Sequence, residues 1–299
     1  MKIVVTGGSG LVGHYLKEML PGATFLSSKD YNLCKEREVE KMFEDLNPDI
    51  VVHLAAKVGG ILDNIENTAR YYTDNVLMNT LLVEHAYKNN VKRFIGILST
   101  CIYPDTVERY PLVEEDLHSG PPTETNFSYG IAKRGMAVQI DSYNQQYGTE
   151  YNYLIPCNLY GISDKDDEKK SHFVTALIKK IYDANLKGED HIVLYGDGTP
   201  IRQFMYAEDL AKIITECIFN NITDSFNVGS SEVYTIDEIA RVALEATNST
   251  HLEIVYDSSK PNGQYRKDTS IDKMKTLFPD FKPTSLSSGI KIVYESLQK

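Results

Sequence analysis

The chain begins with the stretch MKIVVTGGSGLVGHYLKEML, residues 1–20. An apolar run at 2–5 predicts a short strand, and the apolar residues of 11–20 recur at helical spacing. Glycines between them follow a GxxGxxG spacing, which lets the backbone turn tightly and approach a pyrophosphate at the helix N-terminus. The stretch therefore predicts a strand–turn–helix unit that binds a dinucleotide cofactor through Gly7, Gly10, Leu11, Val12 and Gly13.

The same alternation of strands and helices continues along the first half of the chain. Predicted strands at 23–26, 49–55, 93–98 and 151–156 alternate with predicted helices at 35–46, 69–89 and 129–147. Strands that are apolar throughout and separated by helices are typical of a parallel sheet covered on both faces. We therefore expect an α/β protein with a Rossmann-type doubly wound parallel sheet.

The pattern is looser after residue 160. Helices are predicted at 172–187, 204–220 and 235–247, and a strand at 226–229. We see no flexible linker, which indicates two interleaved lobes that share a cleft. We expect a dinucleotide-binding domain at 1–160 with a returning segment near 204–230, and a smaller C-terminal α/β lobe, mainly for the substrate, at 161–299.

The composition argues against several classes of binding partner and site. Among 299 residues, 31 Lys and Arg face 42 Asp and Glu, and the net charge of −11 disfavours nucleic acid and anionic membranes as partners. No apolar run approaches the roughly 18 residues of a membrane span. The four cysteines form no CxxC pair and no zinc-like cluster with histidines, so we expect no metal site. A strand at the very start leaves no room for a signal peptide, and we expect a reduced, cytoplasmic protein.

The end of the second predicted strand bears on cofactor choice. NAD sites usually place a carboxylate there, on the ribose 2′-hydroxyl. This chain has FLSSKD at 25–30, in which Ser27 and Lys29 could hold a 2′-phosphate, so NADP is favoured. Asp30 is the residue that argues against NADP. If its carboxylate turned toward the cofactor, NAD would be favoured.

A catalytic pair is indicated by Tyr129 and Lys133, which are spaced as YxxxK and share one helix face. A lysine there can lower the pKa of the phenol, which could then exchange a proton near neutral pH. A surface helix pair is the plainer interpretation of this spacing alone. Ser99 supports the catalytic one, because it follows a predicted strand at the sheet edge where open α/β sheets bind ligands.

Together these motifs resemble a known family. TGGSGLVG (6–13), HLAAKVGG (53–60), STCIYP (99–104), YGIAK (129–133) and PCNLYG (156–161) are similar to the extended short-chain dehydrogenase/reductases. Within them, the chain most resembles the GDP-fucose synthases, the 3,5-epimerase/4-reductases of GDP-4-keto-6-deoxymannose. The more specific pieces are AAKVGGI (55–61), SH (171–172), GTPxRxF (198–204) and SKPxG (259–263), spread in family order over nearly the whole chain.

The resemblance implies roles for individual residues. Tyr129 would protonate the sugar O4 while NADPH delivers hydride to C4, and Ser99 and Lys133 would assist. Cys101 and His172 match the family's epimerisation pair. The chemistry is reasonable, because a C4 ketone acidifies the hydrogens on C3 and C5, and inversion needs a base on one face and an acid on the other. A thiol and an imidazole titrate in the useful range.

The resemblance also implies binding contacts. Further cofactor contacts are expected from Ala55, Ala56, Pro156, Asn158 and Leu159. Substrate contacts are expected from Asn158, His172, Lys180, Arg202 and Lys260, although a solvated surface charge is an equal interpretation of Lys180. Ser9 and Ser27–Lys29 depart from the family, whose common form has arginines at these places.

Several alternatives stay open. The chain could reduce C4 of a GDP-4-keto-6-deoxy-heptose without full epimerisation. It could be a 4,6-dehydratase, although Thr100-Cys101-Ile102 lacks the usual carboxylates, or a nucleotide-sugar 4-epimerase. A non-catalytic regulator would be expected to have lost Tyr129 or Lys133. The two long helices (69–89 and 129–147) commonly pair across a dimer in the extended family, so we expect a homodimer.

Overall fold

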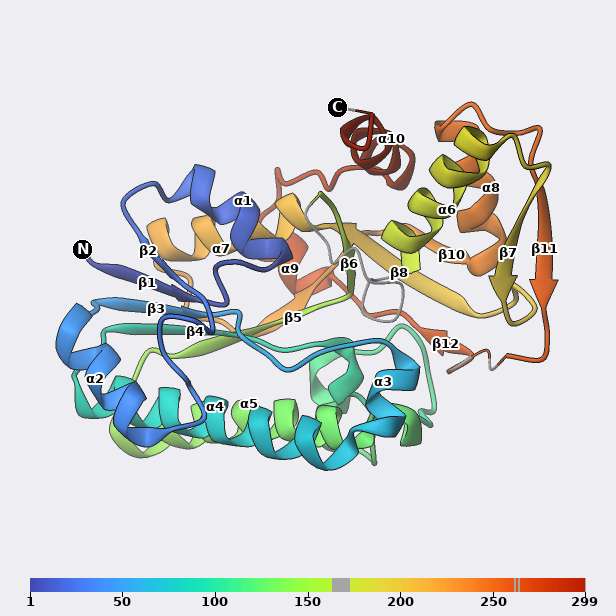
Figure 1. The fold of residues 1–299 in the computed structure, drawn as a ribbon. Coiled ribbons are helices and arrows are strands. Elements are labelled where there is room, and N and C mark those ends of the chain that lie inside the picture. Colours follow the sequence, from blue (N-terminus) through green and yellow to red (C-terminus); the bar gives the residue numbers. More distant parts are fainter. Residues whose placement is uncertain (163–172, 261, 263, 299) are drawn as a thin grey trace.

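A computed structural model describes residues 1–162, 173–260, 262 and 264–298. Its largest sheet is parallel, with six strands in the order β2-β1-β3-β4-β5-β9 (Figure 1). The strands are β1 (Ile3–Thr6), β2 (Thr24–Leu26), β3 (Ile50–His53), β4 (Arg93–Ile97), β5 (Asn152–Pro156) and β9 (Phe226–Val228). The order runs outward in both directions from β1 and β3, as in a doubly wound sheet. The predicted fold class is confirmed.

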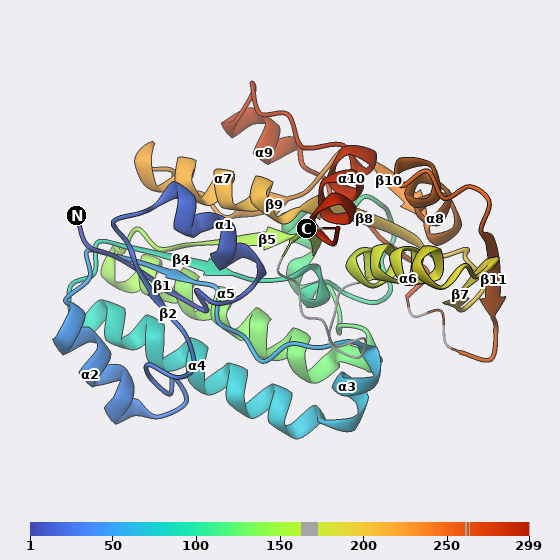
Figure 2. The same ribbon diagram turned by 45° about the horizontal axis from the view of Figure 1, so that its top comes forward.

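Helices cover both faces of this sheet, which explains why β1, β3 and β4 are buried along their whole length. One apolar core joins the sheet to α1 (Leu11–Met19) and α7 (Ala207–Phe219). A second core joins it to α2 (Glu36–Leu46), α4 (Thr68–Lys88) and α5 (Phe127–Tyr147). Figure 2 shows α4 and α5 side by side beneath the sheet, with α1 and α7 above it.

A buried hydrogen-bond chain fixes the strands at the cofactor edge. Thr6 Oγ1 lies 2.7 Å from His53 Nδ1, and His53 Nε2 lies 3.0 Å from Asn79 Oδ1. Asn79 Nδ2 in turn donates to the Ala132 carbonyl at 3.2 Å. Burial lowers the pKa of His53 to about 3, so the ring is neutral. The chain links β1, β3, α4 and α5 and so holds the glycine turn against the helix that carries Tyr129.

The second lobe is built from short strands and helices of the C-terminal half. Its main sheet has the order β10-β8-β12, with β6 also paired to β8, and β7 pairs with β11. The strands are β6 (Asn158–Tyr160), β7 (His191–Tyr195), β8 (Ile201–Tyr206), β10 (Val233–Thr235), β11 (Glu253–Asp257) and β12 (Arg266–Lys267). Besides α7, the helices of this half are α6 (Phe173–Lys187), α8 (Ile236–Ala246), α9 (Asp272–Leu277) and α10 (Leu286–Ser296).

The chain crosses between the lobes more than once. β8 ends at Tyr206, and α7 starts at the next residue and returns to the first sheet, followed by β9. The predicted helix at 204–220 is therefore wrong in its first three residues, which are strand.

The remaining helical segments are α3 (Ile61–Glu66), η1 (Thr100–Ile102), η2 (Glu114–His118) and η3 (Glu124–Asn126). In the described part of the chain, no helix is long and apolar enough to cross a membrane.

Candidate active site

A cleft of about 900 Å³ lies along the carboxyl edge of the first sheet and reaches β8 and β12 of the second lobe. It collects most of the residues predicted from the sequence. The predicted residues that line it are Gly7, Gly10, Leu11, Val12, Gly13, Ser27, Ala55, Ala56, Ser99, Cys101, Tyr129, Lys133, Pro156, Asn158, Leu159 and Arg202. Three others, Lys29, Lys180 and Lys260, are not part of this lining. His172 lies outside the described residues.

The glycine turn leaves no space for side chains. Gly7 has φ +72°, and a Cβ built on it would lie 2.6 Å from the Ala55 nitrogen. A Cβ on Gly13 would lie 2.5 Å from the Gly8 carbonyl oxygen. The cap residue of α1 is Gly10, which offers no side chain to its amides. The first-turn amides therefore face the cleft, where a pyrophosphate is the matching partner.

Asp30 does not turn into the cleft. Its Oδ2 accepts hydrogen bonds from the Ser27 backbone nitrogen at 2.7 Å and the Ser27 hydroxyl at 2.8 Å. These two bonds lower the pKa of the carboxyl. Ser27 and Ser28 line the cleft, whereas Lys29 is exposed beside it. The Asp30 carboxylate thus accepts hydrogen bonds within its own turn, and the serines, not the carboxylate, line this end of the cleft.

Tyr129 and Lys133 are both buried on α5 and both line the cleft. Burial raises the pKa of Tyr129, as do the neighbouring Cys101 and Tyr71, while the Ser99 hydroxyl lowers it. Burial also lowers the pKa of Lys133 to about 7, and its ammonium donates to the Ile97 carbonyl at 2.8 Å. This differs from the expectation that the lysine lowers the pKa of the phenol. Tyr129 is therefore held protonated, ready to donate.

Cys101 follows Ser99 in the 3₁₀ turn after β4. Its amide donates to Ser99 Oγ at 3.3 Å, and its Sγ accepts from Asn126 Nδ2 at 3.0 Å and Lys267 Nζ at 3.1 Å. Burial raises the pKa of the thiol, but Lys267, Ser99 and Arg202 together lower it below its ordinary value. Cys101 is thus not an inert core residue: its sulfur sits in a polar, positively charged corner of the cleft.

Sequence reasoning missed Lys267 and Asn126. Lys267 belongs to the two-residue strand β12, which pairs in parallel with β8 and so places its side chain beside Cys101. A two-residue strand leaves no periodic signal in a sequence. Cys34 is also half-buried and lines the cleft, a place that its position in the sequence did not indicate.

The basic residues expected to bind substrate lie in two different places. Arg202 lines the cleft, and its guanidinium donates to the Ile201 carbonyl at 2.8 Å. Lys180 and Lys260 instead lie 5.1 Å and 5.9 Å from the centre of the Tyr195 ring, which is 59% exposed. Lys180 Nζ also donates to the Val193 carbonyl at 3.0 Å, so both lysines lie beside one exposed ring on the second lobe, away from the cleft lining.

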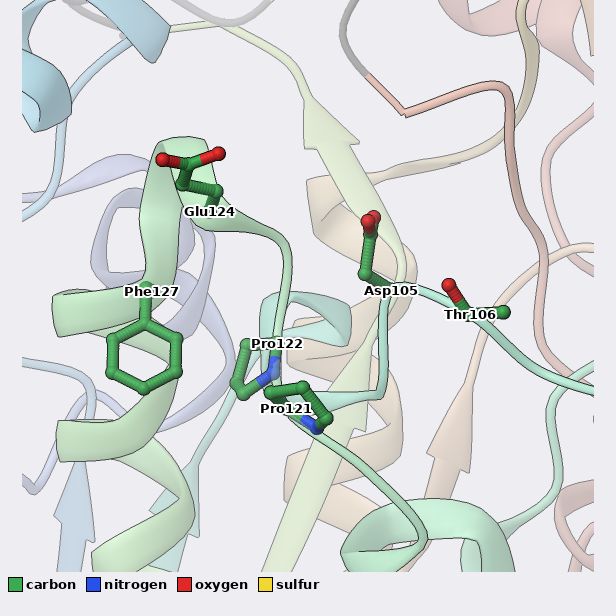
Figure 3. A pocket seen from close by; sticks show the side chains of 6 residues that line it. All are labelled: Asp105, Thr106, Pro121, Pro122, Glu124 and Phe127. Carbon is green, nitrogen blue, oxygen red and sulfur yellow. The ribbon is translucent and has the colours of Figure 1, made fainter.

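A shallower hollow of about 420 Å³ is lined by Asp105, Thr106, Pro121, Pro122, Glu124 and Phe127 (Figure 3). Its side chains are prolines, two carboxylates, a threonine and an exposed phenylalanine. Thr123, from the same segment, donates to Asp105 Oδ1 at 2.8 Å and lines the large cleft. We assign no chemistry to the hollow, because its lining contains neither the thiol nor the cations of the cleft.

The chain is similar to known proteins in sequence and in fold. Residues 3–229 match the NAD dependent epimerase/dehydratase family. The chain belongs to this family. In this chain the glycine turn, the YxxxK pair and Ser99 line one cleft. Family membership agrees with the resemblance to extended short-chain dehydrogenase/reductases.

Individual relatives are more specific. The chain is 35% identical to a GDP-L-fucose synthase of Dictyostelium discoideum, over 97% of this chain and 92% of that protein. It is similar to a GDP-L-fucose synthetase of Naegleria fowleri bound to NADP, with 32% identity, a TM-score of 0.88, and 99% and 94% of the two chains covered. It is also similar to a GDP-6-OMe-4-keto-L-xylo-heptose reductase of C. jejuni, with 25% identity, a TM-score of 0.90, and 99% and 97% covered.

Proposed function

We propose that the protein reduces C4 of a GDP-4-keto-6-deoxy sugar with NADPH after epimerising C3 and C5, as a GDP-L-fucose synthase does. One observation carries the proposal: a single cleft holds the glycine turn, the Ser99–Tyr129–Lys133 set and a thiol beside a lysine. The first two are the apparatus of carbonyl reduction. The third adds a base, which reduction alone does not need.

The cleft suits NADP(H). The uncapped amides of α1 and the tight glycine turn fit the pyrophosphate, and Ser27 and Ser28 face the ribose end, while Asp30 is engaged with Ser27. Lys29 stands beside these serines, where its ammonium would meet a 2′-phosphate. When bound, NADPH supplies the hydride for C4.

For reduction, Tyr129 gives its proton to O4 as the ketone becomes an alcohol. The raised pKa of the phenol keeps that proton available across the physiological range. Ser99 donates a hydrogen bond to the same oxygen, and Lys133, buried behind the tyrosine, stabilises the charge that develops when the proton leaves.

For epimerisation, Cys101 takes the proton from a carbon next to the ketone. The C–H electron pair moves to the carbonyl oxygen, giving an enolate, and a proton returned from the opposite face inverts the centre. His172, the other member of the epimerisation pair that the family resemblance implies, is proposed as the acid on that face, and it lies outside the described residues. Asn158, which donates to the Gln203 carbonyl at 3.0 Å, and Arg202 line the wall beside the sugar.

The nucleotide half of the substrate belongs to the second lobe. Tyr195 offers an exposed ring for stacking, and Lys180 and Lys260 offer charge for the diphosphate. This division gives residues 1–160, with the returning segment near 204–230, to the cofactor, and 161–299 mainly to the sugar nucleotide.

The active form is proposed to be a cytoplasmic homodimer joined through α4 and α5. These long helices carry exposed apolar residues, and Tyr87 stacks on Tyr147 with ring centres 4.3 Å apart. Light scattering after gel filtration tests the dimer, since a monomer at micromolar concentration would contradict it. The cytoplasm is supported by four free thiols, one of them the proposed base.

The function is tested by incubating the protein with GDP-4-keto-6-deoxymannose and NADPH. Oxidation of NADPH is monitored as the loss of its fluorescence. Stoichiometric oxidation with a GDP-6-deoxyhexose product supports the proposal. Oxidation only with a GDP-4-keto-6-deoxy-heptose would favour the heptose reductases, to which the fold is also similar. Interconversion of UDP-glucose and UDP-galactose without net NADPH loss would instead indicate a 4-epimerase.

A further inference from the structure

We propose that Lys267 is the positioning residue that keeps Cys101 as a thiolate, and so makes it the base of the epimerisation. The inference rests on the proposed function for its chemistry, but the state of the thiol can be measured without any substrate.

The geometry is that of an ion pair. Lys267 Nζ lies 3.1 Å from Cys101 Sγ, and Asn126 Nδ2 approaches the same sulfur at 3.0 Å from another element. An ammonium and an amide N–H are both donors, so the sulfur accepts two hydrogen bonds. A neutral thiol is a weak acceptor, whereas a thiolate is a strong one. The two donors therefore select the deprotonated form.

The charge balance points the same way. Lys267 is only 8% exposed, and within the described residues the hydrogen bond recorded for its ammonium is the one to Cys101. The neighbouring carboxylate, Asp268, is already engaged by the Arg266 guanidinium at 2.6 Å. A buried ammonium is costly unless an anion accompanies it, and the thiolate is the anion at hand.

The groups around the sulfur come from several elements, and their charges agree. Lys267 on β12 and Arg202 on β8 are cationic, Ser99 and Asn126 are neutral hydrogen-bonding groups from the strand end and η3, and Tyr129 on α5 is a neutral neighbour. Their combined effect lowers the pKa of Cys101, whereas the same thiolate helps to raise the pKa of Tyr129. The two adjacent groups are thus held in opposite protonation states: Lys267 favours the Cys101 thiolate, a base for C3 and C5, while burial favours the protonated Tyr129, an acid for O4.

In the reaction, the thiol proton leaves to solvent before substrate arrives. The thiolate then forms an S–H bond as the substrate C–H bond breaks, and the electron pair goes to the C4 carbonyl oxygen. Loss of Lys267 removes the cation that lowers the pKa of the Cys101 thiol most, while burial still raises it. With a rise of about one pH unit, deuterium exchange at C3 and C5 is expected to fall by up to about ten-fold at pH 7 and to recover as the pH is raised.

The test measures the pH midpoint of Cys101 alkylation by iodoacetamide, read on its own peptide by mass spectrometry. We expect a midpoint below that of an ordinary thiol in the wild type, and a rise of about one pH unit or more in Lys267→Gln. Lys267→Arg should restore the low midpoint in part. Arg266→Gln is the matched control, because it removes a cation from the same strand that faces Asp268. Cys34, on its own peptide in the same tube, should be unaffected.

An ordinary or raised midpoint in the wild type overturns the inference even if Lys267→Gln does not fold. An unchanged midpoint in Lys267→Gln, together with a higher KM and an unchanged kcat, overturns it as well and makes Lys267 a substrate-binding residue. A shifted midpoint in a protein that exchanges no deuterium from the keto-sugar supports the ion pair and refutes the proposed function.

Discussion

The buried His53 makes the stability of the fold depend on pH in a calculable way. The ring is fully buried between Thr6 and Asn79, and its pKa falls to about 3 in the folded protein. In the unfolded chain the pKa is about 6.5. Below pH 6.5 the unfolded state therefore binds a proton that the folded state does not. Stability from this residue is complete above pH 6.5 and is lost as the pH falls toward 3.

The size of the effect follows from linkage at about 1.4 kcal/mol per pH unit, so roughly 3 kcal/mol is lost between pH 6.5 and 4.5. Urea unfolding of the wild type and His53→Gln at several pH values isolates this loss, because carboxylates titrate alike in both. The free energy of unfolding of the wild type should fall more steeply by that amount. Parallel pH profiles would refute the assignment, as would an NMR signal of His53 that titrates near pH 6.5.

Other expected outcomes concern the cleft. Tyr129→Phe should lower NADPH oxidation by about 10²- to 10⁴-fold while deuterium still enters C3 and C5, and surviving reduction would remove its role as acid. Cys101→Ser should do the reverse, losing deuterium exchange but keeping NADPH binding, and unchanged exchange would exclude the thiol. Gly13→Ala should weaken NADPH binding about ten-fold or more by fluorescence titration, because its Cβ would meet the Gly8 carbonyl at 2.5 Å. Normal affinity would contradict the geometry of the turn.

Much of the first lobe could be predicted because its signals are local. The strand at β1, the glycine turn and α1 follow one another within 20 residues, and the apolar runs at β1, β3 and β4 are strands that are buried throughout. Tyr129 and Lys133 could be identified because their spacing places them on one helix face. Ser99 could be found because it follows a buried strand, and Cys101 because it matches the epimerisation pair of the family that the chain resembles.

The second lobe could not be read in this way, for physical reasons. Its strands β6, β10 and β12 have three, three and two residues, too few for a period to show. Their pairing joins residues far apart in the chain, such as Lys267 and Arg202. The environment of Cys101 depends on that pairing, so the sequence pointed to the thiol but not to the lysine beside it.

The central claim is that one active site both epimerises and reduces. It is tested most directly by turning over GDP-4-keto-6-deoxymannose with NADPH in D₂O and locating deuterium in the product by NMR and mass. The account predicts deuterium on both C3 and C5, above an enzyme-free control, with one NADPH oxidised per product. NADPH oxidation without carbon-bound deuterium would contradict it and leave the protein a C4 reductase.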